Sequence, residues 1–417
     1  MIDVDLVRTR FPALATGTVF LDNPGGTQIA RGALWRMERY LKSTNANHGG
    51  AFKASRESDA TVAEGRAAAA DFLNAPRPEE IVFGPNMTTL TLHLGRSLAR
   101  TLVPGDEIVV TRLDHDANVA PWLLIAEDRG AVVRWVDVDP SDCTWSLEAL
   151  RSVVSPRTKL VAVGWASNAA GTVNDVAGAC RIAREAGALS FVDSVHWAPH
   201  GPIDVQAIGC DFLACSAYKF FGPHLGLLWG RYDLLDSLTA YKVRPAGNLP
   251  PDKFETGTQS FEAVAGMLGA IEYLAWIGDT FGAPFRERLA PRFSGRRLAL
   301  KAGMEAIREQ EAALTAGLAD RLGAIRGLRL RGITDRARFA DRVPTFSFTL
   351  EGHAPREVCE ELDRDGIAAW DGNYYALSLS EKLGVEETGG MVRVGAVHYN
   401  TLGDLDRLAR SLGRIAS

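Results

Sequence analysis

The chain has 417 residues, of which 46% are hydrophobic and 23% are charged, a composition typical of a globular protein with a large core. Its net charge of −5 gives no electrostatic case for nucleic-acid binding. We find no apolar run of about 18 residues that predicts a membrane span and no signal-peptide pattern, and the five scattered cysteines fit a reduced cytoplasmic setting without disulfides.

Hydrophobic patterns and turn signals predict the following elements. The expected helices cover residues 2–10, 29–42, 56–74, 146–154, 175–186, 259–276 and 292–325, with breaks at Pro291, Gly295 and Gly303, and one more helix begins near Leu90. The expected strands cover residues 18–21, 81–83, 106–111, 131–137, 158–166, 189–195, 225–231, 344–349, 367–370 and 391–394, and another opens at Phe212.

Strands and helices alternate through the middle of the chain, which predicts an α/β fold with a mostly parallel sheet and right-handed crossovers. Near residue 280 the pattern changes to long helices followed by short strands. We therefore expect a large domain over residues 15–280 and a smaller α+β domain over 281–417, on which the N-terminal segment 1–14 packs.

Two polar residues close neighbouring apolar strands. Asp193 ends the strand over 189–195, and Lys219 follows the strand that opens at Phe212. Burial lowers the pKa of an amine, and a neutral amine forms a Schiff base with an aldehyde. Pyridoxal phosphate (PLP) needs such a lysine, together with an acid beside its pyridine nitrogen. Because ligands bind at the carboxyl ends of strands in open α/β sheets, this pair predicts a PLP site.

A phosphate site is expected near the start of the helix that follows the strand over 81–83. Backbone amides and hydroxyls at a helix N-terminus bind anions, and here they belong to Met87 and Thr88. Simple helix capping is the alternative interpretation of this segment.

Asp193, Ser216, Tyr218 and Lys219 resemble the cofactor motifs of the class V aminotransferase family of PLP enzymes, and most closely those of its cysteine desulfurase branch. In that branch the lysine motif reads Ser-x-His-Lys, so Tyr218 replaces the usual histidine. The resemblance extends from about residue 10 to the C-terminus. It implies PLP fold type I, with a seven-stranded sheet in the large domain.

The resemblance also implies further cofactor contacts. His196 takes the place of a residue that touches the cofactor oxygen or the substrate, and Asn168 that of an amide donor to the same oxygen. A histidine of the family stacks on the cofactor ring, and here either His115 or Asp116 faces it. Thr258 corresponds to a threonine that reaches the neighbouring subunit's phosphate, which implies a homodimer with shared active sites.

Other residues are expected to contact an α-amino acid substrate. Arg393 lies inside an apolar strand and resembles the family's arginine, whose planar guanidinium forms a bidentate clamp on the substrate carboxylate. A structural ion pair is the alternative for this arginine. Asn23 in the glycine-rich turn, His48 in a polar loop, and Tyr374 are the remaining candidates for the substrate pocket.

The position of the desulfurase cysteine is different in this chain. In the resembling loop a cysteine takes up the substrate sulfur, whereas Tyr375 stands in that place here, and the nearest cysteine, Cys359, precedes the strand. A phenol does not carry persulfide sulfur, so we expect an enzyme other than a cysteine desulfurase. Tyr375 is either an acid–base group of the reaction or a packing residue.

We expect Lys219 to hold PLP and then to remove the Cα proton of an α-amino acid, with Asp193 supporting the ring. Elimination of a Cβ thiolate, as in a C–S lyase, is the preferred outcome. Transamination and epimerisation or racemisation are the alternatives, and a PLP-binding protein without turnover is a further one. A nucleotide-binding enzyme is not favoured, because the chain has neither a G-x-G-x-x-G nor a Walker A motif. No metal site is expected, since Pro199 interrupts the segment between His196 and His200.

Overall fold

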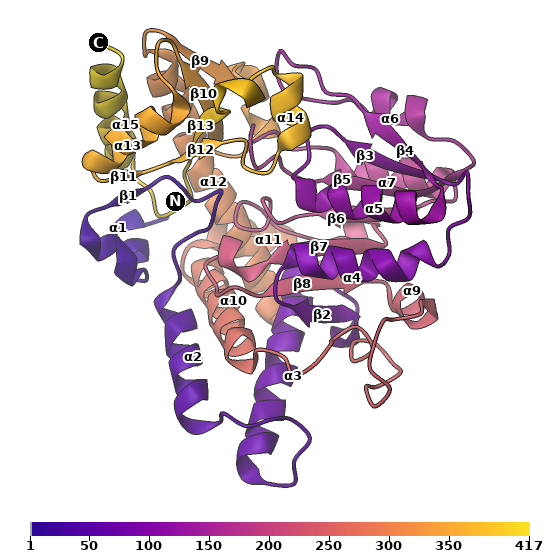
Figure 1. Cartoon of the computed structure of the whole chain (residues 1–417). Helices are drawn as coiled ribbons and strands as arrows, with labels where there is room; N and C mark the ends of the chain where they lie inside the picture. The colour runs from indigo at the N-terminus through magenta and orange to yellow at the C-terminus, as the bar shows by residue number, and fades with distance from the viewer. Residues whose placement is uncertain (1) are drawn as a thin grey trace.

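The computed structural model describes residues 2–417, which form three β-sheets surrounded by helices (Figure 1). The strands are β1 (Val19–Phe20), β2 (Ile81–Gly84), β3 (Glu107–Thr111), β4 (Val132–Val136), β5 (Thr158–Gly164), β6 (Leu189–Asp193), β7 (Phe212–Ser216), β8 (Gly226–Gly230), β9 (Leu328–Arg331), β10 (Thr345–Leu350), β11 (Ile367–Ala368), β12 (Trp370–Gly372) and β13 (Met391–Gly395).

The α-helices connect and cover these sheets. They are α1 (Val4–Arg8), α2 (Arg31–Ser43), α3 (Lys53–Leu73), α4 (Met87–Ala99), α5 (Ala120–Arg129), α6 (Leu147–Val153), α7 (Val176–Glu185), α8 (Val205–Ile208), α9 (Tyr232–Ser237), α10 (Phe261–Phe281), α11 (Ala283–Leu289), α12 (Gly295–Gly323), α13 (Pro355–Arg364), α14 (Leu377–Lys382) and α15 (Leu402–Ile415).

The largest sheet has the strand order β2-β8-β7-β6-β5-β3-β4 and confirms the expected seven-stranded, mostly parallel arrangement. Only β8 runs antiparallel to its neighbours, β2 and β7, within this sheet of the described chain. Since β5, β6 and β7 are parallel and adjacent, their carboxyl ends meet at one edge. This edge is where an open α/β sheet binds its ligands.

Alternating side chains of the sheet enter two separate cores. Along β5, Val161 and Val163 pack in the core that contains residues of α3, α7 and α10, whereas Leu160 and Ala162 pack in the core that contains residues of α4 and α5. Successive residues of a strand point to opposite faces, so a sheet covered on both faces requires an apolar residue at every position. The continuous apolar run of β5 meets this requirement.

The helix α10 corrects the expectation that the chain has no long apolar run. An 18-residue window of α10 has a mean hydropathy of 1.2, so its length and composition alone would suit a membrane span. However, 78% of that window is buried inside the structure, where α10 contacts α2, α3 and α12. We therefore describe α10 as a core helix of this fold.

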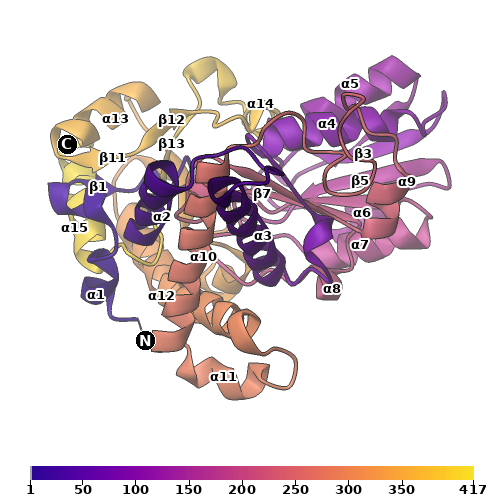
Figure 2. The same cartoon turned by 90° about the horizontal axis from the view of Figure 1, so that it is seen from below.

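The C-terminal part of the chain builds a four-stranded antiparallel sheet in the order β12-β13-β10-β9. The N-terminal segment joins this region, because β1 pairs with β11 and the Arg8 guanidinium donates a hydrogen bond to the Tyr399 carbonyl at 3.0 Å. Figure 2 shows α1, α15 and the β1–β11 pair together on one side of the molecule. The boundary between two domains near residue 280 stays a prediction.

Several predicted boundaries differ from the structure. The helix α4 begins at Met87 rather than near Leu90, because the Asn86 side chain accepts a hydrogen bond from the Thr89 amide at 2.9 Å and caps the helix there. Gly303 does not break α12. Its missing side chain allows close approach of α10, since a Cβ there would lie 2.6 Å from the Leu274 carbonyl. The short strand β9 was not predicted.

The crossing of α10 and α12 provides a test of the packing. A Cβ at Gly278 would clash with the backbone carbonyl of Ala299, so Gly278→Ala is expected to destabilise the fold by at least about 2 kcal/mol. The control is Gly323→Ala at the end of α12, where an added Cβ meets no atom within 4 Å. Urea denaturation measures the free energy of unfolding of both variants. Equal stability of the two variants would contradict the close helix crossing.

Candidate active site

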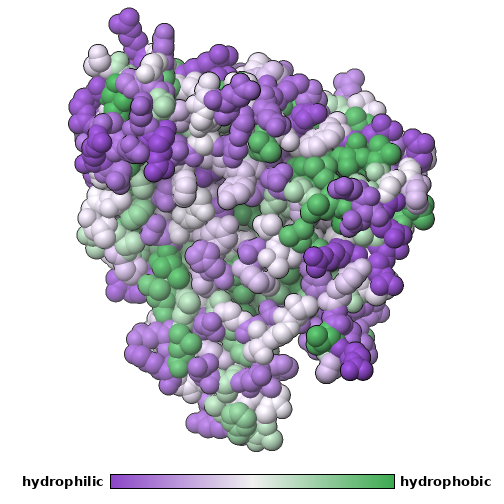
Figure 3. Space-filling view, viewed as in Figure 1, coloured by the Kyte–Doolittle hydropathy of each residue, from purple (hydrophilic) through white to green (hydrophobic). Residues whose placement is uncertain are grey.

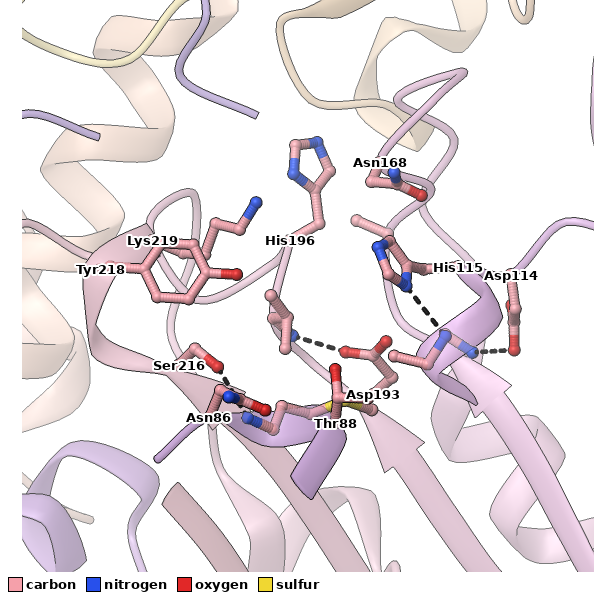
Figure 4. A pocket seen from close by; sticks show the side chains of 15 residues that line it. Asn86, Thr88, Asp114, His115, Asn168, Asp193, His196, Ser216, Tyr218 and Lys219 are labelled. Atoms are coloured by element: carbon pink, nitrogen blue, oxygen red, sulfur yellow. Dashed lines mark hydrogen bonds between the residues drawn. The ribbon is translucent and has the colours of Figure 1, made fainter. Parts of the chain in front are cut away.

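A pocket lies at the carboxyl ends of β5, β6 and β7 and at the N-terminus of α4 (Figure 4). Figure 4 shows that the Lys219 amine and the His196 ring extend into the same open space, above Asp193 and Thr88. The residues that line the pocket are Asn86, Met87, Thr88, Asp114, His115, Ala117, Gly164, Ala166, Asn168, Asp193, Val195, His196, Ser216, Tyr218 and Lys219. The structure thus gathers most of the predicted cofactor contacts in one place.

Lys219 reaches the pocket from a short 3₁₀ turn, Ala217–Lys219, that directly follows β7. Its side chain is buried, and the amine donates hydrogen bonds to the carbonyls of Pro24 and Gly25, the latter at 3.0 Å. Burial, followed by the nearby Arg393 charge, lowers the pKa of the Lys219 amine to about 7. An amine with this pKa is substantially neutral near physiological pH, which is the form that attacks an aldehyde.

Asp193 is the last residue of β6 and lies beside Lys219 on the neighbouring strand end. One carboxylate oxygen accepts a hydrogen bond from the Val195 amide at 2.8 Å. Burial raises the pKa of Asp193 to about 6, and the Lys219 charge opposes this shift. A positively charged partner in the pocket would therefore stabilise the ionised carboxylate, as a protonated pyridine nitrogen does.

A second buried carboxylate, Asp114, lines the same pocket as Asp193 and was not singled out from the sequence. It accepts hydrogen bonds from the Thr111 hydroxyl at 2.9 Å, the Asn118 amide at 2.8 Å and the Gly164 backbone at 2.9 Å. Burial raises its pKa to about 7, and the charge of Asp193 contributes to this shift. Its position just after β3 is the sequence signal that could have identified it. The three bonds fix the turn that carries His115.

His115, rather than Asp116, lines the pocket. Its Nδ1 atom accepts the Ala117 amide hydrogen bond at 3.0 Å, which fixes the ring tautomer. Burial and the charges of Lys219 and Arg393 lower the pKa of His115 to about 3, so the ring is neutral. The Tyr375 ring stacks on His115 with centroids 5.4 Å apart and an interplanar angle of 24°.

The N-terminus of α4 closes the pocket on the side of β7 and β8. The Ser216 hydroxyl accepts a hydrogen bond from the Met87 amide at 3.1 Å, and the exposed Thr88 side chain borders the pocket. β8 approaches the start of α4 so closely that a Cβ at Gly226 would clash with the Asn86 backbone. Thirteen aligned peptide groups of α4 direct their positive end here, which suits a phosphate group.

Arg393 in β13 lies beside the pocket and is almost completely buried. Its guanidinium donates a hydrogen bond to the Asn168 carbonyl at 3.0 Å and lies 4.2 Å above the centre of the Tyr374 ring. The Asn168 side-chain amide, which we expected to hold the cofactor oxygen, donates to the Tyr374 carbonyl at 2.8 Å. Tyr374 is thus buried: its ring lies under the Arg393 guanidinium, and its carbonyl accepts the hydrogen bond from Asn168.

Three buried polar atoms near Lys219 have no hydrogen-bond partner within residues 2–417: Asp22 Oδ1, Asn168 Oδ1 and Arg393 Nε. Burial raises the pKa of Asp22, while the charges of Arg393 and Lys219 oppose the shift, so this carboxylate belongs to the same electrostatic cluster. The sequence reasoning missed Asp22, although it precedes Asn23 in the glycine-rich turn. Buried polar atoms without partners are costly, and a polar ligand would satisfy them.

His196 and Tyr218 complete the pocket wall. The His196 Nε2 atom lies 3.0 Å from the Thr345 hydroxyl, and burial lowers the pKa of this histidine well below its usual value. The Tyr218 ring stacks on His224 with centroids 5.1 Å apart. Burial raises the pKa of Tyr218, so the phenol remains protonated. Both side chains therefore present neutral polar groups to a ligand.

Four predicted residues lie elsewhere. The Asn23 amide is used inside the fold, where it donates to the carbonyls of Phe20 at 2.9 Å and Gly395 at 2.8 Å, so it does not line the pocket. His48 and Thr258 are exposed and border a separate depression. Tyr375 is 72% exposed, which does not favour an acid–base role within one protomer.

A buried lysine and a buried acid on adjacent strand ends, opposite a helix N-terminus, define the site of a PLP-dependent enzyme of fold type I. The family model "Aminotransferase class-V" matches residues 19–282 and 296–408, and the chain belongs to this family. Members of the family, including cysteine desulfurases, use PLP.

Known relatives agree with this assignment. The aminotransferase-like protein FGM3 of Gibberella zeae is 34% identical, with 98% of this chain and 97% of that protein aligned. A probable cysteine desulfurase of Xylella fastidiosa is 31% identical over 99% of this chain and 95% of its own length. The apo structure of a cysteine desulfurase from Thermococcus onnurineus superposes with a TM-score of 0.86 at 25% identity, covering 100% of this chain and 98% of that one.

The pocket residues fit PLP. Lys219 would bind the aldehyde, Asp193 would hold the pyridine nitrogen, and the start of α4 with Ser216 and Thr88 would bind the phosphate. The polar atoms of Asn168 and Arg393 that have no protein partner add donor and acceptor capacity beside these groups. The donor set therefore matches the chemistry of the whole cofactor.

The pKa of Lys219 predicts how cofactor binding depends on pH. Because burial lowers this pKa to about 7, the neutral amine increases about tenfold per pH unit below 7 and levels off above about pH 8. The rate at which stripped protein recovers its visible absorbance on adding PLP should follow this curve. The reaction of PLP with Nα-acetyl-lysine, whose amine has a pKa of about 10.4, is the reference for an ordinary lysine. A protein rate that keeps rising to pH 10 would show an ordinary lysine.

Proposed function

We propose that the protein is a PLP-dependent lyase. It removes the Cα proton of an α-amino acid and breaks the bond between Cβ and sulfur, so that a thiolate leaves. It is not a cysteine desulfurase in this proposal. The observation that carries the proposal is a pocket with Lys219 and Asp193 in place, Arg393 beside it, and no thiol among its lining residues. All five cysteines are buried elsewhere in the described chain.

Arg393 supports the choice of an α-amino acid. Its Nε atom has no hydrogen-bond partner within residues 2–417, and only one backbone carbonyl contact to Asn168 is present. A planar guanidinium with free donors suits a carboxylate, which accepts two parallel hydrogen bonds. The Tyr374 ring supports the guanidinium from one side, so the arginine keeps its orientation when the substrate leaves.

The chemistry divides between the cofactor and the protein. When bound, PLP withdraws electrons from the substrate Cα. Lys219, neutral near pH 7, takes the Cα proton and holds it at Nζ, while the Asp193 carboxylate holds the pyridine nitrogen in place. His115 and His196 remain neutral beside the reacting groups. For an S-substituted cysteine and water, the products are pyruvate, ammonia and a thiol.

Transamination is the second candidate, with epimerisation or racemisation as further alternatives. The observation that favours transamination is the 34% identity to a protein named aminotransferase-like. An aminotransferase would use Lys219 to return the proton to the cofactor carbon, whereas an epimerase would need an acid on the opposite face of Cα. Burial raises the pKa of Tyr218, so its phenol stays protonated. Tyr218 is therefore the candidate for this acid in the pocket wall.

A homodimer is part of the proposal. His48, Thr258 and the exposed Val243 border a surface depression, and Leu41, Phe52 and Leu249 are further exposed apolar side chains. Figure 3 shows apolar side chains at the lower end of the molecule, near the end of α2 and the loop before α3. A second copy that covers this region would bring Thr258 toward the pocket of that copy.

Two further expectations belong to the proposal. The chain divides into two domains near residue 280, and the protein is located in the cytoplasm.

The lyase proposal predicts a specific set of products. Purified protein incubated with S-conjugates of L-cysteine should release pyruvate and the thiol in equal amounts, and Lys219→Ala should release neither. A keto acid that keeps the thiol, with conversion of the cofactor to its amine form, would indicate transamination. L-Alanine together with released sulfur from free L-cysteine would contradict the proposal and restore the desulfurase reading.

The carboxylate clamp predicts a selective kinetic defect. Arg393→Lys keeps the charge but loses the two-pronged contact, so KM for the amino acid should rise at least about tenfold with a smaller change in kcat. The control is Arg329→Lys, an exposed arginine on β9 of the same sheet, which should leave both constants unchanged. An unchanged KM in Arg393→Lys would show that Arg393 is only a structural cation.

A further inference from the structure

A buried polar cluster adjoins His196 outside the proposed reaction. The His200 Nδ1 atom lies 2.7 Å from Glu311 Oε2, and the two side chains are only 4% and 3% exposed. The other Glu311 oxygen accepts a hydrogen bond from the His398 backbone amide at 3.1 Å. Glu311 therefore ties together α12, the turn after β6 and the connection between β13 and α15. Nothing in the proposed chemistry uses this buried acid.

The pair separates two cavities of the protein. His196 lines the pocket of Lys219, whereas His200 and Glu311 line a second cavity between α12 and the segment before β10. The rings of His196 and His200 meet edge to face, with centroids 5.2 Å apart and an interplanar angle of 72°. The His200–Glu311 pair thus stands directly behind one wall of the cofactor pocket.

The contacts give the two histidines different roles. His196 bonds to the neutral Thr345 hydroxyl, while His200 has the contact with the Glu311 carboxylate. A carboxylate stabilises the protonated form of an imidazole that it contacts, and a positive charge disfavours protonation of a neighbouring imidazole. In this arrangement the imidazole of the pair, and not its carboxylate, adjoins the His196 ring.

We infer that Glu311 and His200 are positioning residues that hold His196 neutral and make this wall of the cofactor pocket electropositive. The inference rests on PLP binding at Lys219 and not on the reaction proposed above. A positive wall favours the deprotonated form of the lysine-bound cofactor and stabilises the negative oxygen of its ring. Removing the pair should therefore raise the pH at which the bound cofactor titrates.

Other charged groups face the cluster and remain in place in the test. Tyr273 contacts the His398 ring from α10. The remaining groups are Glu305, Arg308, Glu309 and Arg342 around the second cavity, and Lys219, Arg393 and His115 around the pocket.

The test is a spectrophotometric pH titration of the cofactor-loaded protein. In Glu311→Gln, which keeps the size of the side chain, the midpoint of the cofactor band should rise by about 0.5 to 1 pH unit. His200→Gln should shift it in the same direction, because it removes the other half of the pair. Far-UV circular dichroism and bound cofactor per chain are measured alongside, so that a titration is compared only between folded, loaded proteins.

The matched control is Glu309→Gln, an exposed acid on the same helix that lines the same cavity, which should shift the midpoint by less than about 0.2 unit. An unchanged or lowered midpoint in both test variants overturns the inference. Loss of the fold in both variants also overturns it, because the pair is then a structural brace. Failure of the lyase reaction with a raised midpoint would leave the inference standing.

Discussion

The burial of one amine at the end of β7 is the constraint on which the site depends. A lysine inside a protein loses hydration, and the structure compensates with carbonyl oxygens of the 22–26 turn and with the nearby charges of Asp193 and Asp22. The amine is therefore poised between its charged and neutral forms. The parallel order of β5, β6 and β7 fixes this arrangement, because it brings Asn168, Asp193 and Lys219 to one edge of the sheet.

Positive and negative groups around this amine are balanced. Arg393 lowers the pKa of Lys219, whereas Asp193 and Asp22 raise it. Asp114 adds a further carboxylate beside Asp193, and its own pKa rises to about 7 as a result of burial and that neighbouring charge. Two buried acids that line the same pocket raise the pKa of one another, which favours retention of a proton on one of them. The pocket thus gains a cation with little electrostatic penalty, which is what a protonated pyridine ring requires.

Much of this arrangement could be predicted from the sequence, because apolar runs that end in a polar residue mark strand ends. That signal identified Asp193 and Lys219, and the alternation of strands with helices identified the sheet. It did not identify Asp114 or Asp22, since a carboxylate after a strand is more often a turn former than a buried acid. Asn23 was assigned to the substrate, but its amide bonds to backbone carbonyls that only the folded chain brings near.

The segment 370–376 shows most clearly what the sequence could not give. Tyr374 and Tyr375 both have positive φ angles, +55° and +61°, which tyrosine rarely adopts. Their contacts maintain this backbone: Tyr374 lies under Arg393, and the Tyr375 carbonyl accepts the Asp116 amide at 2.7 Å. The segment therefore contacts both Arg393 in β13 and the turn that carries His115. No pattern of residues predicts contacts between positions so distant in the chain.

The most direct test of this account is to identify the residue that carries the cofactor. The PLP-loaded protein is reduced with borohydride, digested, and analysed by mass spectrometry for a pyridoxyl-lysine peptide. The account predicts that this modification occurs on Lys219 and on no other lysine, at close to one pyridoxyl group per chain. Modification of a different lysine, or no bound cofactor even after PLP is added, would contradict it.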